Sequence, residues 1–178
     1  MLVDIARLIL DLVAALLGSL LVLRAYMGWL GMPGRNPLAQ FTFALTQWIV
    51  GPLSRLLPRR GRIDWASLVA ALIVATVFVS LLLLLLGLPL SPLLVLAGAA
   101  LQVLRWALYM AMWLTILYAI LSWVNPHAPI APALAMLVRP FLAPIQRVLP
   151  MVGGVDLSPI VLIVLINVGL MVLGRLGI

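Results

Sequence analysis

The sequence predicts an all-α integral membrane protein that crosses the bilayer four times. Two compositional observations support this prediction: 66% of the 178 residues are hydrophobic, and only 8% are charged. A soluble domain carries about 25% charged residues, so this chain could not cover a water-facing surface. The third observation is four apolar runs, each close to the roughly 20 residues that cross a hydrocarbon core.

Three of the apolar runs contain no charged residue: residues 66–90, 106–124 and 157–174. The remaining run, residues 12–30, is interrupted by Arg24. We predict spans at about residues 10–30, 65–88, 102–124 and 157–175. An arginine inside a span is a functional hypothesis by default. Because Arg24 is close to the end of its span, we favour the interpretation that it snorkels to the interface.

Two long connections, residues 31–64 and 125–156, mix apolar residues with arginine and proline. Proline removes a backbone donor and interrupts helices. We therefore expect short interfacial helices, over about residues 37–57 and 132–149, broken at their prolines; re-entry into the membrane is the alternative. The prolines concerned are Pro52, Pro58, Pro140, Pro144 and Pro150.

The arginines predict the orientation. The net charge is +7, and the two long connections hold most of the arginines. Both connections fall on one side of a four-span protein, which the positive-inside rule makes cytoplasmic, so both termini would lie outside. Trp29, Trp65 and Trp123 mark span ends on the same side, as interfacial tryptophans do. The sequence thus predicts a multi-pass protein of the bacterial inner membrane.

A basic cluster in the first connection consists of Arg55, Arg59, Arg60 and Arg62. Anionic lipid headgroups are the expected partner, because each cation near such a surface contributes roughly 1 kcal/mol. Nucleic acid is a disfavoured alternative, which salt-sensitive DNA binding would identify.

The composition also limits the chemistry. There is no cysteine, which excludes thiol nucleophiles and thiolate metal sites, and the single histidine, His127, cannot build a zinc site alone. No nucleophile–base arrangement or phosphate-binding glycine loop is present. We therefore predict a non-enzymatic protein with no cofactor and no metal.

The chain contains an internal repeat with an offset of 92 residues, in which residues 51–58 (GPLSRLLP) align with residues 143–150 (APIQRVLP). The same offset pairs Asp64 with Asp156 and Tyr26 with Tyr118. Asn36 pairs with Asn125 after a small gap. We predict two halves, residues 1–90 and 91–178, each with two spans and one interfacial segment, arranged as parallel repeats.

The second half carries three motifs: SWVNP at residues 122–126, PIQRVLP at 144–150 and GGVDLSP at 153–159. These resemble the S-W-x-N-P, P-I-R-x-x-x-P and G-G-x-D-x-S-P elements of the YggT family of bacterial and plastid membrane proteins. Gln146 interrupts the second element. The first half is degenerate, because Ala66 and Ser67 stand where the second half has Ser158 and Pro159.

The resemblance implies a role in membrane-complex assembly, cell division or nucleoid organisation, or osmotic and ion tolerance. Plastid relatives resemble factors for haem attachment to a cytochrome. No catalytic chemistry is established across the family, so the resemblance says more about architecture than about activity.

Two interpretations of the motif residues stay open. Asp156 and Ser158, followed by Pro159, suit the start of a helix, where they would cap it; an ion or proton site is the sharper alternative. Arg55 and Arg147 each precede an aspartate by nine residues. We expect salt bridges from Arg55 to Asp64 and from Arg147 to Asp156, with separate headgroup binding as the alternative.

Small residues recur every four positions on two spans, which permits close helix packing; we favour packing within the chain, with a homodimer face as the alternative. They are Ser67, Ala71 and Ala75, and Ala107, Ala111, Thr115 and Ala119. Asn167 is the main polar residue of the last span. The leading hypothesis is a membrane scaffold or assembly factor that contacts lipid and a membrane-protein partner. The alternative is a small ion channel or transporter, which would need polar groups at mid-membrane.

Overall fold

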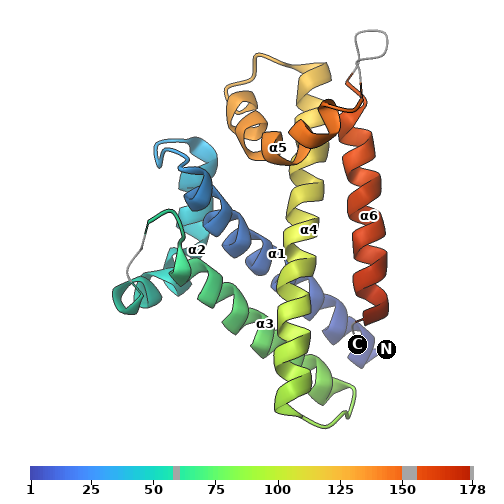
Figure 1. Cartoon of the computed structure of the whole chain (residues 1–178). Helices are drawn as coiled ribbons and strands as arrows, with labels where there is room; N and C mark the ends of the chain where they lie inside the picture. Colours follow the sequence, from blue (N-terminus) through green and yellow to red (C-terminus); the bar gives the residue numbers. More distant parts are fainter. Residues whose placement is uncertain (58–60, 150–155, 177–178) are drawn as a thin grey trace.

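The computed structural model describes residues 1–57, 61–149 and 156–176, and this part of the chain forms six helices (Figure 1). Four of them are long and apolar enough to cross a membrane, as predicted. The other two helices connect them in pairs. In chain order the helices are α1 (Leu2–Leu30), α2 (Pro37–Leu56), α3 (Trp65–Leu85), α4 (Pro92–Val124), α5 (Ala131–Gln146) and α6 (Ser158–Leu176).

Two of the long helices begin earlier than the sequence predicts. α1 starts at Leu2 and α4 at Pro92, about eight to ten residues before the expected spans. Proline in the first helical turn, after Ser91 at the N-cap, explains the start of α4. With 33 residues α4 is about 50 Å long, more than the roughly 30 Å of a hydrocarbon core. It must therefore tilt or extend beyond the core.

Glycines in the left-handed conformation end two of the spans. Gly31, with φ +69°, follows α1, and Gly87, with φ +67°, follows α3. Behind Gly31, the backbone N–H of Met32 donates to the carbonyl of Met27. Residues with a side chain rarely adopt this φ, so glycine stops each helix here and reverses the chain.

The expectation that the connecting helices break at their prolines is wrong for the three prolines that the structure describes. α2 continues through Pro52, and α5 continues through Pro140 and Pro144. A proline in a helix loses one hydrogen bond and bends the axis, but packing against neighbouring helices can keep the helix continuous. Pro58 and Pro150 lie outside the described residues.

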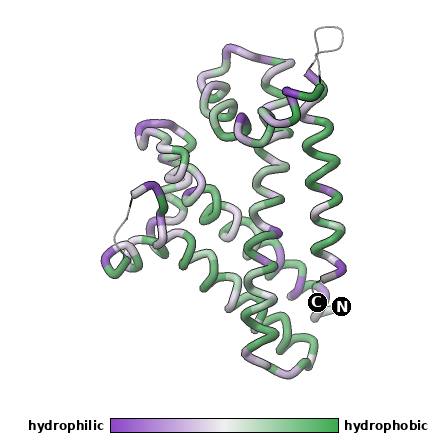
Figure 2. The backbone as a smooth tube through the Cα atoms, viewed as in Figure 1, coloured by the Kyte–Doolittle hydropathy of each residue, from purple (hydrophilic) through white to green (hydrophobic). Residues whose placement is uncertain are grey.

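The long helices carry their apolar residues along most of their length (Figure 2). In Figure 1 the two termini lie close together, and α1 and α3 run obliquely to α4 and α6. α2 packs on α1 and α3, whereas α5 packs on α4 and α6. Each half therefore has two candidate spans and one connecting helix that packs on both.

Small residues bring the long helices together. On α3, Ser67, Ala71 and Ala75 are fully buried, and α1 packs along this helix. On α4, Ala111 and Thr115 are buried while Ala107 and Ala119 are half-buried. These positions support the predicted close packing within the chain.

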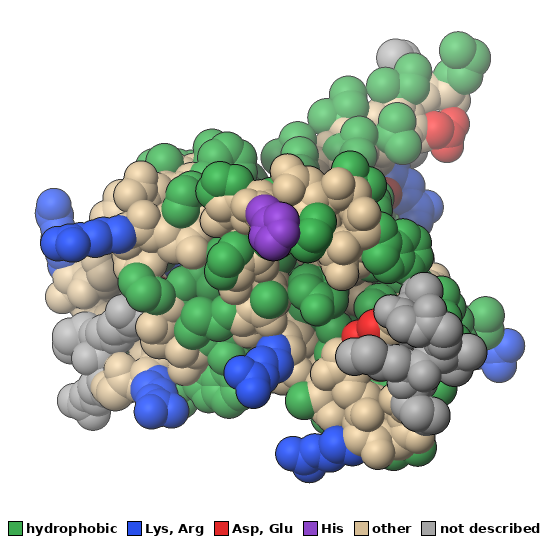
Figure 3. All heavy atoms as spheres, turned by 90° about the horizontal axis from the view of Figure 1, so that it is seen from above, with side chains coloured by type: hydrophobic (Ala, Val, Ile, Leu, Met, Phe, Trp, Pro, Cys, Tyr) green, Lys and Arg blue, Asp and Glu red, His purple; other side chains and the backbone are tan. Residues whose placement is uncertain are grey.

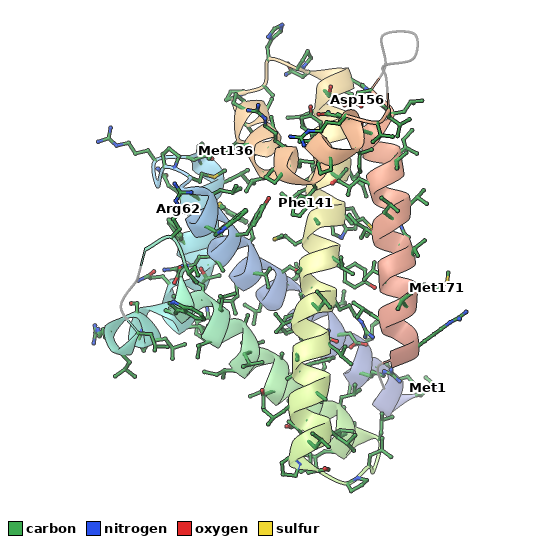
Figure 4. The ribbon with its side chains drawn as sticks, viewed as in Figure 1. Met1, Arg62, Met136, Phe141, Asp156 and Met171 are labelled. Atoms are coloured by element: carbon green, nitrogen blue, oxygen red, sulfur yellow. The ribbon has the colours of Figure 1, made fainter. Side chains whose placement is uncertain are left out.

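The two halves meet where α1 packs on α4. The indole of Trp106 is fully buried against Gly18, and a Cβ at position 18 would collide with the ring. Further along α1, the Tyr26 hydroxyl donates to the carbonyl of Leu137 in α5 over 2.8 Å, and its ring stacks on Phe141 with centroids 5.4 Å apart. Figure 4 shows Phe141 on the side of α5 that faces α1. Aromatic and backbone contacts therefore join the halves.

Candidate functional site

A buried polar network in the first half is the main candidate site, and Arg24 on α1 is its centre. The side chain is only 9% exposed, in contrast to the predicted snorkelling, which is wrong. α2 covers the end of α1 that the side chain was expected to reach, so the guanidinium is held inside the protein. It also lies over the ring of Phe43, 4.8 Å from the centroid, at cation–π distance.

The guanidinium binds α2 through two hydrogen bonds. Its Nη1 donates to Thr46 Oγ1 and its Nη2 to Gln47 Oε1, each over 3.0 Å. The Thr46 hydroxyl in turn donates to the carbonyl of Thr42, and both threonines are fully buried. An arginine with its fixed fork of donors thereby fixes the position of α2 along α1.

The third contact of Arg24 is ionic and reaches α3. Its Nε lies 3.7 Å from Oδ2 of Asp64, and the two side chains are 10% and 15% exposed. Asp64 is also the N-cap of α3, since it accepts from the backbone N–H and the hydroxyl of Ser67. One carboxylate thus neutralises the arginine and caps the helix, which joins α1, α2 and α3.

The predicted salt bridges from Arg55 to Asp64 and from Arg147 to Asp156 are wrong. Among the described residues, no arginine nitrogen other than that of Arg24 lies within 4 Å of either aspartate. Arg55 and Arg147 are both exposed. A spacing of nine residues allowed those pairs, but Asp64 instead faces α1.

Asp156 in the second half has neutral partners. It accepts from Gln146 Nε2 over 2.8 Å and from the backbone N–H of Ser158 over 2.9 Å. Burial acts to raise the pKa of the Asp156 carboxyl, but the hydrogen bonds from Ser158 and Gln146 outweigh it, so the pKa lies below its ordinary value. Figure 4 shows Asp156 near the start of α6 beside α5. The capping interpretation fits both aspartates.

The other predicted residues do not join either cluster. Asn36 caps α2 by accepting from the N–H of Leu38, whereas Asn125 ends α4. Pro144 lies within α5, and Ser158 and Pro159 are buried at the start of α6. Asn167 is exposed and donates to the carbonyl of Ile163 in its own helix.

Two of the four arginines predicted to contact lipid lie in the described part of the chain. Arg55 and Arg62 are exposed, while Arg59 and Arg60 lie outside the described residues. In the view from above, arginines lie around the edge of the visible face, and the single histidine, His127, lies exposed on it (Figure 3).

Sequence reasoning missed Thr46, Gln47 and Gln146. A signal for Thr46 was available, because Thr42 and Thr46 are four residues apart in a mainly apolar segment and therefore share a helix face. A polar stripe of this kind, beside a span that contains one arginine, indicates the partner of that arginine.

The fold and the buried network define a multi-pass membrane protein whose first connecting helix is fixed by polar contacts. The sequence model of the CCB3/YggT family matches residues 3–86 and 97–177, and the chain belongs to this family. No solved structure matches the chain.

Two relatives are similar to this chain over most of its length. The uncharacterized protein YggT of Escherichia coli strain K12 is 37% identical over 161 residues, which cover 90% of this chain and 84% of the relative. An uncharacterized protein of Vibrio alginolyticus is 35% identical over 142 residues, which cover 72% of this chain and 71% of the relative.

Proposed function

We propose that the protein is a non-enzymatic scaffold or assembly factor of the bacterial inner membrane. In this proposal α2 and α5 face the cytoplasm, both termini lie outside, and the connecting helices contact anionic lipid and a membrane-protein partner. A contribution to membrane-complex biogenesis, cell division or osmotic tolerance would follow from the identity of that partner.

The observation that carries the proposal is the use made of Arg24 and Asp64. Both are ionisable groups that are costly to hold away from water. Here they contact each other and fix α2 on the spans. Burying two ionisable groups to hold α2 suits a helix that must present one face in a fixed orientation.

The outer face of α2 is the surface so presented. Phe41, Leu45 and Trp48 follow one another at helical spacing and are 59%, 40% and 66% exposed. Arg55 and Arg62 lie at the end of the same helix and just beyond it, both exposed. An apolar stripe with neighbouring cations can lie in the headgroup layer and still dock on a partner's span.

The test is site-specific photo-crosslinking in native membranes, followed by purification of the chain and its adducts. A cross-linker in place of Trp48 should capture one dominant membrane protein. A cross-linker in place of Leu93, which is 76% exposed near the start of α4, is the matched control and should capture lipid or nothing specific. Equal adduct patterns from the two positions would contradict the proposal.

The alternative, an ion channel or transporter, is tested separately in liposomes that contain the purified protein. Rapid and selective ion flux that depends on Arg24 or Asp64 would replace the scaffold proposal.

A further inference from the structure

A second polar region lies far along the chain from the buried network. A cavity of about 390 Å³ opens between the N-terminal part of α1, the C-terminal part of α3 and the N-terminal part of α4. Arg7, Leu8, Gly98 and Leu101 of its lining belong to the turns by which α1 and α4 exceed the predicted spans. Its polar lining comes from Arg7, Asp11, Gln102, Arg105 and Tyr109.

The charges in the cavity leave a guanidinium without a carboxylate. Arg7 lies 3.9 Å from Asp11, and both side chains are half exposed. Arg105 has no carboxylate within 4 Å among the described residues; its nearest polar contact is Gln102 Oε1 at 3.5 Å. A half-buried arginine in a partly apolar cavity favours an anion beside it.

Trp106 borders the same cavity but is fully buried. Its Nε1 is completely buried and has no hydrogen-bond partner in the described part of the chain. The opposite edge of the indole, around Cε3 and Cζ3, lies against Gly18. An indole N–H can only donate, but this one has no accessible surface, so the donors that face the cavity are those of the arginines.

An apolar groove adjoins the cavity. It has a volume of about 680 Å³, lies between α1, α2, α4 and α5, and is lined almost entirely by apolar side chains. Leu12, Ala15 and Tyr109 belong to the walls of both hollows. A donor-rich cavity beside a long apolar groove has the shape and polarity of a molecule with an anionic head and an alkyl chain.

We propose that this region binds one anionic glycerophospholipid. Its phosphate occupies the cavity beside Arg105, where Arg7 supplies further donors, and an acyl chain extends along the groove. The site is separate from the arginines near α2, and the proposal does not rest on the scaffold function.

Native mass spectrometry of the purified full-length protein in mild detergent provides the test. Phosphatidylglycerol and phosphatidylcholine with identical acyl chains are titrated in parallel, and glycerol 3-phosphate reports binding of a headgroup without chains. We expect the first bound phosphatidylglycerol to be held roughly tenfold more tightly than phosphatidylcholine, and glycerol 3-phosphate not to be retained.

Arg105→Gln should weaken phosphatidylglycerol binding roughly tenfold. Arg175→Gln is the matched control, because it removes an exposed arginine from the last turn of α6, outside the cavity, and should leave binding unchanged. Equal losses from the two variants would overturn the site. Equal affinity of the unchanged protein for the two lipids would overturn it without any variant, and retention of glycerol 3-phosphate at the same affinity would overturn the role of the groove.

Discussion

The two halves of the chain hold their connecting helices, α2 and α5, in different ways. In the first half, Arg24 connects α2 to α1 and α3 through two hydrogen bonds and the ionic contact with Asp64. At the offset of 92 residues, the second half has Ile116 in place of Arg24. It also has Leu134 and Val138 in place of Thr42 and Thr46. These two threonines, the leucine and the valine are all buried.

A connecting helix packed on two spans can therefore be stabilised by two kinds of contact. α5 depends mainly on apolar packing, with one hydrogen bond from Tyr26 of α1 to the Leu137 carbonyl and another from Gln146 to Asp156 at its end. α2 depends on hydrogen bonds and an ion pair. Loss of one side chain from these contacts leaves the polar group of its partner buried without a contact. We therefore expect the first half to respond to loss of charge, and the second half to respond to loss of volume.

The largest effect is expected for Arg24→Ala, which removes one partner of a buried ion pair. The free energy of unfolding should fall by about 3–5 kcal/mol, because Asp64 and Thr46 remain buried without their cation. Thermal unfolding in detergent measures the change. Arg175→Ala, an exposed arginine of α6, should stay within about 0.5 kcal/mol of the unchanged protein. A similarly small effect of Arg24→Ala would show that the network does not hold α2.

The next effect concerns the contact that joins the halves. Gly18→Ala should lower the free energy of unfolding by about 1–3 kcal/mol, because the new Cβ collides with the buried ring of Trp106. Alanine is otherwise the better helix former by about 1 kcal/mol. Gly174→Ala is the control, since nothing lies within 4 Å of that Cβ. Unfolding in the same detergent should therefore give opposite signs, and two stabilising substitutions would contradict the packing of α1 on α4.

Exchanging the side chains between the halves sharpens the comparison. Thr46→Val removes the acceptor of Arg24 Nη1 and should cost about 1–3 kcal/mol of unfolding free energy. Val138→Thr at the corresponding position should cost less, because the new hydroxyl can donate to the carbonyl four residues earlier, as Thr46 does to Thr42. Equal costs in unfolding experiments would mean that the polar contacts add nothing specific to the first half.

The smallest effect is the pH dependence of Asp156. Since its pKa is lowered in the folded protein, the stabilisation it contributes is complete above the ordinary carboxyl pKa of about 3.9. That contribution is lost as the pH falls through the lowered value. Carbon NMR of the carboxyl group should show the low pKa, and Gln146→Ala should move it back upward. A pKa at or above the ordinary value in the unchanged protein would rule out these hydrogen bonds.

The spans could be predicted because hydrocarbon imposes a simple requirement on the sequence. Long uncharged runs located the ends of α3 and α6 within about three residues, and the two connecting helices lie within about three residues of the expected ranges. The N-terminal ends of α1 and α4 were missed, because Arg7 and Arg105 interrupt the apolar pattern without interrupting the helix.

The candidate site was less predictable because its contacts depend on tertiary packing. Arg24 and Asp64 were both recognised, but each was assigned a different environment: the interface for the arginine and Arg55 for the aspartate. Nothing in the spacing of two residues 40 positions apart states that α1 and α3 bring them together. The continuous α5 shows the same limit, because packing overrides the local preference of proline to end a helix.

A double-mutant cycle on Arg24 and Asp64 tests the central claim most directly. Arg24→Met and Asp64→Asn each remove one charge, and asparagine can still cap α3. We expect each single variant to be destabilised. The double variant should lose less unfolding free energy than the two single variants together, with a coupling energy of about 1–3 kcal/mol. Strictly additive unfolding free energies would contradict the central claim.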